Sequence, residues 1–133
     1  MPSLEKLIFF VDDDKMILNL LEYTFKNRMN YKVKCFFSGE ECLEHLSEMP
    51  SLIVLDHCFN KMGSSSLTGF QTLEKIKQQM PAVPVIMLSS QEDKDLIPKF
   101  MAAGARGYIS KDDYFVDSLM ELIDAELSTS AGS

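Results

Sequence analysis

Apolar residues along this chain fall into short continuous runs and into segments with wider, regular spacing. The continuous runs are residues 7–11 (LIFFV), 52–55 (LIVL) and 83–88 (VPVIML). A run that is apolar at every position is typical of a central strand of a parallel sheet, because both faces of such a strand are covered. Residues 31–37 alternate more and predict an outer strand, and the short segment 107–110 predicts a strand at the other edge.

The segments between the predicted strands have helical spacing. Two of them open with a capping-box pattern, SGEE at residues 38–41 and TGFQ at residues 68–71, and Pro81 ends the second helix. Pro98 is tolerated in the first turn of a helix, so we expect that helix to begin two or three residues earlier and to end at Gly104.

Strands and helices therefore alternate as five βα units, the last helix being capped by Asp112 or Asp113. Right-handed crossovers place the helices on both faces of the sheet, which predicts a doubly wound α/β fold with a ligand site at the carboxyl ends of the central strands. The 133 residues fit one domain, which we expect to span residues 1–127, with residues 128–133 as a disordered tail.

Charge and composition narrow the function classes. The formal net charge of -7 disfavours direct binding of nucleic acid, which requires a basic surface. No apolar run approaches the roughly 20 residues of a membrane helix, so we expect no membrane insertion, and the N-terminus lacks the pattern of a signal peptide. Three cysteines without metal-like spacing, Cys35, Cys42 and Cys58, indicate reduced thiols in a cytoplasmic protein.

Polar residues follow the predicted strands at the edge where a ligand site is expected. They comprise several carboxylates, two hydroxyls and one ammonium group: Asp12, Asp13, Asp14, Asp56, Ser89, Ser90 and Lys111. Asp12, Asp13 and Asp56 would form an all-oxygen anionic pocket of the kind that holds Mg²⁺. Asp14 is better explained as an acidic residue in the first turn of the following helix, where the macrodipole favours it.

The same residues can act on a phosphoryl group. A carboxylate at a strand end, such as Asp56, can be a nucleophile that forms an aspartyl phosphate. The Lys111 ammonium group can pair with one phosphoryl oxygen, and the Ser89 hydroxyl can donate a hydrogen bond to another. The sequence therefore predicts phosphoryl transfer to Asp56 assisted by a metal ion.

Four stretches carry a resemblance to a known family: VDDD at 11–14, LIVLD at 52–56, PVIMLSS at 84–90 and AGARGYISK at 103–111. In this order they resemble the receiver domain of two-component response regulators, the family that includes the chemotaxis regulator. The resemblance covers about the whole chain. It implies a flavodoxin-like sheet with the strand order 2-1-3-4-5.

The resemblance also implies a signalling function. Asp56 would accept a phosphoryl group from a histidine kinase or a phosphotransfer protein, and Ser89 and Lys111 would hold that group. Tyr108 occupies the position of an aromatic residue that turns inward when Ser89 moves toward the phosphate. A downstream protein partner would read the change on the surface formed by the helix before residues 107–110, that strand and the last helix. Such a protein catalyses only its own phosphorylation and dephosphorylation and is not a conventional enzyme.

A metal site is implied by the same resemblance. Asp13 and Asp56 would bind Mg²⁺ together with the backbone carbonyl of Cys58. Asp12 would bind it directly or through water.

The sequence departs from the family pattern in three places. The loop 57–69 is longer than usual and lacks the usual proline. Lys111 is followed by Asp112 where the family has a cis-proline; a cis bond before a non-proline residue costs roughly 2.5–4 kcal/mol, so we expect a trans bond. The hydroxyl residue is Ser89 where threonine is also common in the family.

Three other functions compete with this interpretation. A degenerate receiver would bind protein partners without phosphorylation, although the retained Asp13, Asp56 and Lys111 argue against it. An aspartyl-nucleophile phosphatase needs a second acid two residues after the nucleophile, where this chain has Cys58. A flavin-binding protein would not line its phosphate loop with aspartates, because like charges repel.

Overall fold

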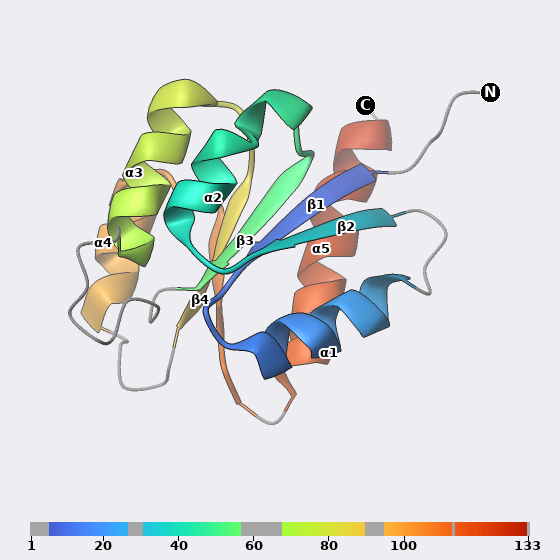
Figure 1. Ribbon diagram of the computed structural model, residues 1–133. Coiled ribbons are helices and arrows are strands. Elements are labelled where there is room, and N and C mark those ends of the chain that lie inside the picture. The colour runs from blue at the N-terminus through green and yellow to red at the C-terminus, as the bar shows by residue number, and fades with distance from the viewer. Residues whose placement is uncertain (1–5, 27–30, 57–67, 90–94, 113, 133) are drawn as a thin grey trace.

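The structure is a computed structural model, shown in Figure 1. It describes the chain except for residues 1–5, 27–30, 57–67, 90–94, 113 and 133, and it describes no side chains after residue 127. The strands are β1 (Lys6–Val11), β2 (Tyr31–Phe36), β3 (Leu52–Asp56), β4 (Val85–Ser89) and β5 (Gly107–Ser110). The helices are α1 (Lys15–Lys26), α2 (Gly39–Glu44), the 3₁₀ turn η1 (Leu46–Glu48), α3 (Gly69–Gln79), α4 (Ile97–Ala102) and α5 (Phe115–Gly132).

The strands form one parallel sheet in the order β2-β1-β3-β4-β5. Helices α1 and α5 cover one face of the sheet, and α2, α3 and α4 cover the other (Figure 1). The predicted doubly wound fold, its strand order and its two helical layers are therefore confirmed.

Two apolar cores lie on either side of the sheet, because alternate strand residues point in opposite directions. Phe9 lies in the core beneath α2 and α3, where its ring meets that of Phe36 edge-on at 4.8 Å between centroids. Phe10 lies in the other core, 5.3 Å from the ring of Phe25 on α1. Strands β3 and β4 are buried at every position, as their uninterrupted apolar runs predict.

The two predicted capping boxes differ in outcome. At α3, the Thr68 hydroxyl accepts a hydrogen bond from Gln71 N (3.1 Å), and the Gln71 side chain accepts one from Thr68 N (3.0 Å), so this box is confirmed. At α2, Ser38 accepts a hydrogen bond from Glu41 N (3.2 Å), but the Glu41 carboxylate accepts its bond from Phe37 N (2.9 Å) instead of from Ser38 N. The prediction of a reciprocal box was therefore wrong at α2, because the Glu41 side chain reaches one residue further back.

The C-terminal helices follow the predicted pattern with small shifts. Pro98 lies in the first turn of α4, and Gly104 follows the helix with a φ of +110°, which is unfavourable for other residues. Before α5, the Asp112 carboxylate accepts a hydrogen bond from Tyr114 N (2.9 Å). Helix α5 continues to Gly132, past the predicted domain end at residue 127, and that domain end stays a prediction.

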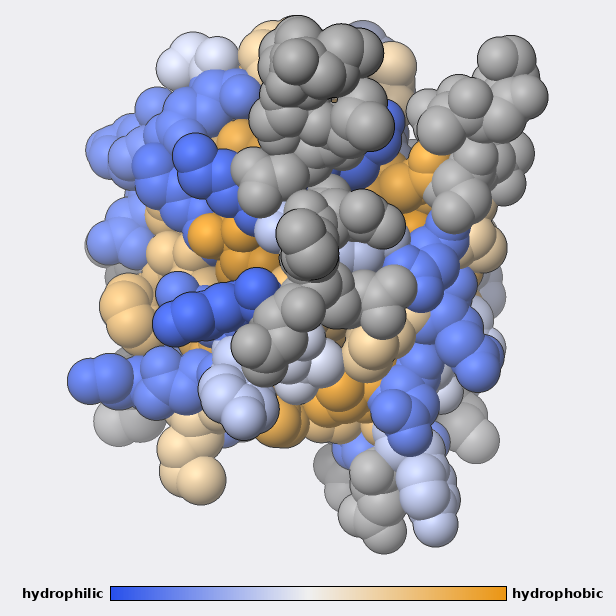
Figure 2. Space-filling model, turned by 90° about the vertical axis from the view of Figure 1, so that its right-hand side faces the viewer, coloured by the Kyte–Doolittle hydropathy of each residue, from blue (hydrophilic) through white to orange (hydrophobic). Residues whose placement is uncertain are grey.

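The cysteines and the surface complete the description. Cys35 and Cys42 are free thiols that lie on opposite faces of the sheet, and Cys58 is outside the described residues. The cytoplasmic location inferred from the cysteines stays a prediction. Among the residues that the structure describes, no helix is long and apolar enough to cross a membrane. On the face shown in Figure 2, hydrophilic residues flank smaller patches of hydrophobic ones.

Candidate functional site

Four of the predicted site residues lie at the carboxyl ends of adjacent strands. Asp12 follows β1, and its N–H continues the ladder to β2 by donating to the Phe36 carbonyl (3.0 Å). Asp56 and Ser89 are the last residues of β3 and β4. Lys111 follows β5, and its N–H donates to the Ser89 carbonyl (2.8 Å). Backbone hydrogen bonds of the sheet thus fix where these side chains begin.

The three predicted metal-binding carboxylates form one cluster. Asp12, Asp13 and Asp56 each offer an oxygen, and these oxygens all lie within 4.8 Å of one another. Asp12 and Asp56 are each only 1% exposed, whereas Asp13 is exposed and forms the solvent side of the cluster. Buried carboxylates so close together repel one another unless a cation lies between them.

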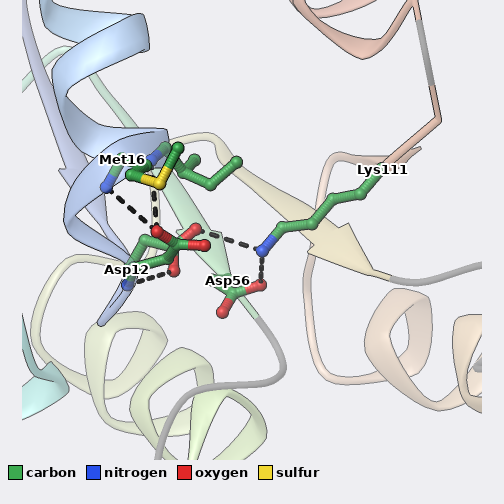
Figure 3. A network of polar contacts seen from close by, with 6 residues as sticks. Asp12, Met16, Asp56 and Lys111 are labelled. Carbon is green, nitrogen blue, oxygen red and sulfur yellow. Dashed lines mark hydrogen bonds and ion pairs between the residues drawn. The ribbon is translucent and has the colours of Figure 1, made fainter.

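Lys111 is the cation that the described residues supply. Its Nζ lies 3.1 Å from Asp12 Oδ2 and 2.7 Å from Asp56 Oδ1 (Figure 3). Asp56 Oδ1 nevertheless lacks an aligned hydrogen-bond donor among the described residues, so its contact with Lys111 is an ion pair only. The three carboxylates of the cluster form an all-oxygen donor set of the kind that suits a divalent cation.

The charges of the site perturb one another. Burial, followed by the neighbouring charge of Asp56, raises the pKa of Asp12 from 3.8 to about 7, even though Asp14 N–H and Lys111 act in the opposite direction. Burial by itself lowers the pKa of Lys111, but the negative charges of Asp56 and Asp12 outweigh it and raise that pKa overall. Without a further cation, the site therefore favours a protonated Asp12 and a charged Lys111.

Ser89 provides a second unsatisfied group. Its hydroxyl is buried at the end of β4, and Oγ has no hydrogen-bond partner within the described part of the chain. A buried hydroxyl without a partner costs about 1–3 kcal/mol, so it is rarely kept unless something else binds there. Among the described residues, the site thus holds a buried hydroxyl and a buried carboxylate oxygen that both lack a hydrogen-bond partner.

Asp14 makes a contact that the sequence analysis missed. Its N–H donates to Asp12 Oδ1 (2.9 Å), and its own Oδ1 accepts from Met16 N (2.9 Å) and Ile17 N (3.5 Å). Asp14 therefore precedes α1 as its cap, whereas the sequence analysis expected it inside the first turn. The preference of aspartate for hydrogen bonds to nearby backbone N–H groups was the signal that could have located it.

The other predictions for the site concern Cys58, Tyr108 and the peptide bond after Lys111. Cys58 lies outside the described residues, as does most of the unusual loop 57–69. Tyr108 lies on β5 and is 42% exposed. The bond between Lys111 and Asp112 is trans, as predicted.

Known proteins similar to this chain are response regulators and their receiver domains. Residues 8–124 match the model of the response regulator receiver domain. The chain is 31% identical over 106 residues to the transcriptional activator protein ExaE of Pseudomonas putida, covering 78% of this chain and 47% of that protein. It is 32% identical over 109 residues to the alkaline phosphatase synthesis transcriptional regulatory protein PhoP of Bacillus subtilis, covering 81% of this chain and 43% of that protein.

The chain thus spans about half the length of these curated relatives. Among solved structures, it is similar to the receiver domain of NtrX from Brucella abortus, with a TM-score of 0.81 and 27% identity, covering 92% of this chain and 98% of that one.

Proposed function

Because the chain belongs to the family of response regulator receiver domains of two-component signalling, we propose that it accepts a phosphoryl group on Asp56 from a histidine kinase or a phosphotransfer protein. One observation carries the proposal. Asp56 is buried at the end of β3, and its carboxylate meets a lysine and two further aspartates. The neighbouring strand β4 ends in Ser89, whose buried hydroxyl has no hydrogen-bond partner among the described residues. These are the groups that a phosphoryl acceptor requires around its nucleophile.

In the proposed phosphoryl transfer, Asp56, Lys111 and Ser89 would each have a separate role. A carboxylate oxygen of Asp56 attacks phosphorus, the P–N bond to the donor histidine breaks, and the imidazole leaves with the electron pair of that bond. The Lys111 ammonium group, already 2.7 Å from Asp56 Oδ1, pairs with negative charge on the transferring group. The Ser89 hydroxyl donates to a phosphoryl oxygen and so gains the partner that it lacks among the described residues.

Mg²⁺ fits the donor set of the site. Asp12, Asp13 and Asp56 offer only carboxylate oxygens, which suit this ion. When bound, Mg²⁺ would neutralise charge on the transferring phosphoryl group. The backbone carbonyl of Cys58 is proposed as a further ligand.

Signalling would proceed from the site to the far edge of the sheet. A phosphoryl group on Asp56 adds negative charge and strong acceptors, and Ser89 and Lys111 move toward it. The Lys111 N–H is bonded to the Ser89 carbonyl, so a shift of β4 is passed to β5, which carries Tyr108. A protein partner would then read the surface of α4, β5 and α5 through a population shift, and the chain would not act as a conventional enzyme.

Phosphorylation by a small donor tests the proposal directly. Incubation with acetyl phosphate and Mg²⁺ should add the mass of one phosphoryl group to the wild-type protein, and Asp56→Asn should gain none. Asp117→Asn, which changes an exposed aspartate on α5, serves as the matched control and should be modified like the wild type. If the folded wild type stays unmodified with acetyl phosphate and with phosphoramidate, the alternative of a degenerate receiver replaces this proposal.

A further inference from the structure

The run of three aspartates has one member that the proposed chemistry does not use. Asp12 and Asp13 belong to the acidic cluster, whereas Asp14 contributes no oxygen to it. Asp14 instead contacts the cluster and the first turn of α1 at the same time. Figure 3 shows Asp12, Met16, Asp56 and Lys111 within one network of polar contacts.

We propose that Asp14 is a positioning residue for the metal site: by capping α1, it holds its own N–H against Asp12 Oδ1 and so presents the other oxygen of Asp12 to the site. This inference rests on the proposed function, because it concerns the same acidic cluster.

Two sets of contacts fix the loop at Asp14. On the side of the helix, its carboxylate accepts from Met16 N at 2.9 Å and from Ile17 N at 3.5 Å, and its carbonyl accepts from Leu18 N at 3.1 Å. On the side of the site, its N–H donates to Asp12 Oδ1 at 2.9 Å. A loop tied at both ends has little freedom to turn that N–H away from Asp12.

The consequence for Asp12 follows from its geometry. Its backbone N–H is held by the Phe36 carbonyl at 3.0 Å, and its Oδ1 is held by Asp14 N–H. Oδ2 is therefore the oxygen that faces Lys111, at 3.1 Å. A carboxylate held in this way binds a metal ion without first losing side-chain freedom, and groups that orient a ligand typically change metal affinity by about 10–100-fold when they are removed.

Capping and charge can be separated by substitution. Serine caps helices about as well as aspartate but carries no charge, whereas alanine caps poorly and glycine offers no side-chain acceptor. Asp14→Ser therefore keeps the proposed positioning and removes the charge, and Asp14→Ala and Asp14→Gly remove both. Thr68→Ala is the matched control, since it removes the side-chain cap of a different helix, α3.

The experiment measures the Mg²⁺ dissociation constant of each intact protein by calorimetry, and protection of the residue 14 amide by hydrogen exchange. We expect Asp14→Ser to bind within about twofold of the wild type, and Asp14→Ala to bind about tenfold more weakly with a less protected amide, near the lower end for orienting groups. Thr68→Ala should lose stability comparable to Asp14→Ala while its Mg²⁺ affinity stays unchanged.

The outcomes separate the two proposals. If the wild type binds Mg²⁺ and Asp14→Ala and Asp14→Gly bind it equally well, the positioning inference is overturned and the proposed function stands. Equal weakening in Asp14→Ser and Asp14→Ala overturns it too, because charge would then be the cause. If the wild type itself shows no Mg²⁺ binding, the metal step of the proposed function fails, and this inference falls with it.

Discussion

Replacement of Asp12 by asparagine should stabilise the metal-free protein, although it removes an ion pair. Asp12 is 1% exposed, and its oxygen lies within 4.8 Å of carboxylate oxygens of Asp13 and Asp56. Burial and the charge of Asp56 raise its pKa from 3.8 to about 7. Folding therefore disfavours the ionised form of Asp12, and a neutral side chain of the same shape removes that cost.

The size of the effect follows from the pKa. At about 1.4 kcal/mol for each pKa unit, a shift from 3.8 to about 7 corresponds to an upper limit of about 4 kcal/mol for ionised Asp12. The favourable effect of Lys111 on ionised Asp12 is already contained in this pKa, and asparagine can keep the bond from Asp14 N–H. We therefore expect Asp12→Asn to raise the free energy of unfolding by up to about 4 kcal/mol above neutral pH.

The direction in which the stability of the wild type changes with pH follows from the raised pKa of Asp12. A carboxyl whose pKa is raised by folding binds more protons in the native state than in the unfolded state between 3.8 and about 7. The stability of the wild type should therefore fall as the pH rises through this window, relative to the variant. The advantage of Asp12→Asn should be near zero at and below about pH 4 and reach its full value at about pH 8.

Urea unfolding followed by far-ultraviolet circular dichroism, with EDTA present, measures both values. Asp117→Asn serves as the control, and an exposed substitution of this kind should change stability by no more than about 0.5 kcal/mol. Equal stability of Asp12→Asn and wild type at the higher pH, or a gain that is the same at both pH values, would refute the electrostatic reasoning. Addition of Mg²⁺ should stabilise the wild type and remove the advantage of the variant.

Two further predictions concern the scaffold. Gly39→Ala should destabilise the protein by about 1–3 kcal/mol in thermal or urea unfolding, because the added Cβ would lie 2.0 Å from Thr72 Oγ1. A second substitution in the same chain, Thr72→Ala, should recover part of this loss. If Gly39→Ala were more stable than the wild type, the predicted clash would be wrong. Met49→Gly should stabilise the protein by roughly 0.5–1 kcal/mol, because Met49 is 70% exposed at a φ of 61°, and Met49→Ala should bring no such gain.

Much of the fold could be predicted from the sequence because its signals are local or periodic. The uninterrupted apolar run of residues 52–55 predicted a strand covered on both faces, and Leu52–Asp56 is buried at each position. The pair of Thr68 and Gln71 predicted the start of α3 through two short-range hydrogen bonds. The strand order came from family resemblance, since periodicity alone does not say which strands are neighbours.

For the site, the grouping of the residues could be predicted from the sequence, but their side-chain contacts could not. Residues 12, 56, 89 and 111 could be assembled at one edge of the sheet because the carboxyl ends of parallel strands meet there. The sequence alone did not reveal that Ser89 Oγ is buried without a partner among the described residues, or that Lys111 spans Asp12 and Asp56. Those facts depend on side-chain directions and burial, which arise only when distant strands pack.

The hydrogen bonds at the helix ends were predicted from the sequence only in part. The sequence determined that Glu41 would reach back past the start of α2, but only the packed chain decided that Phe37 N–H would be its donor. It also determined that three aspartates would follow β1, whereas tertiary structure sorted them into two cluster members and a cap. Like residues in one run differ in function because burial, backbone direction and neighbouring charge differ at each position, and these are properties of the folded chain.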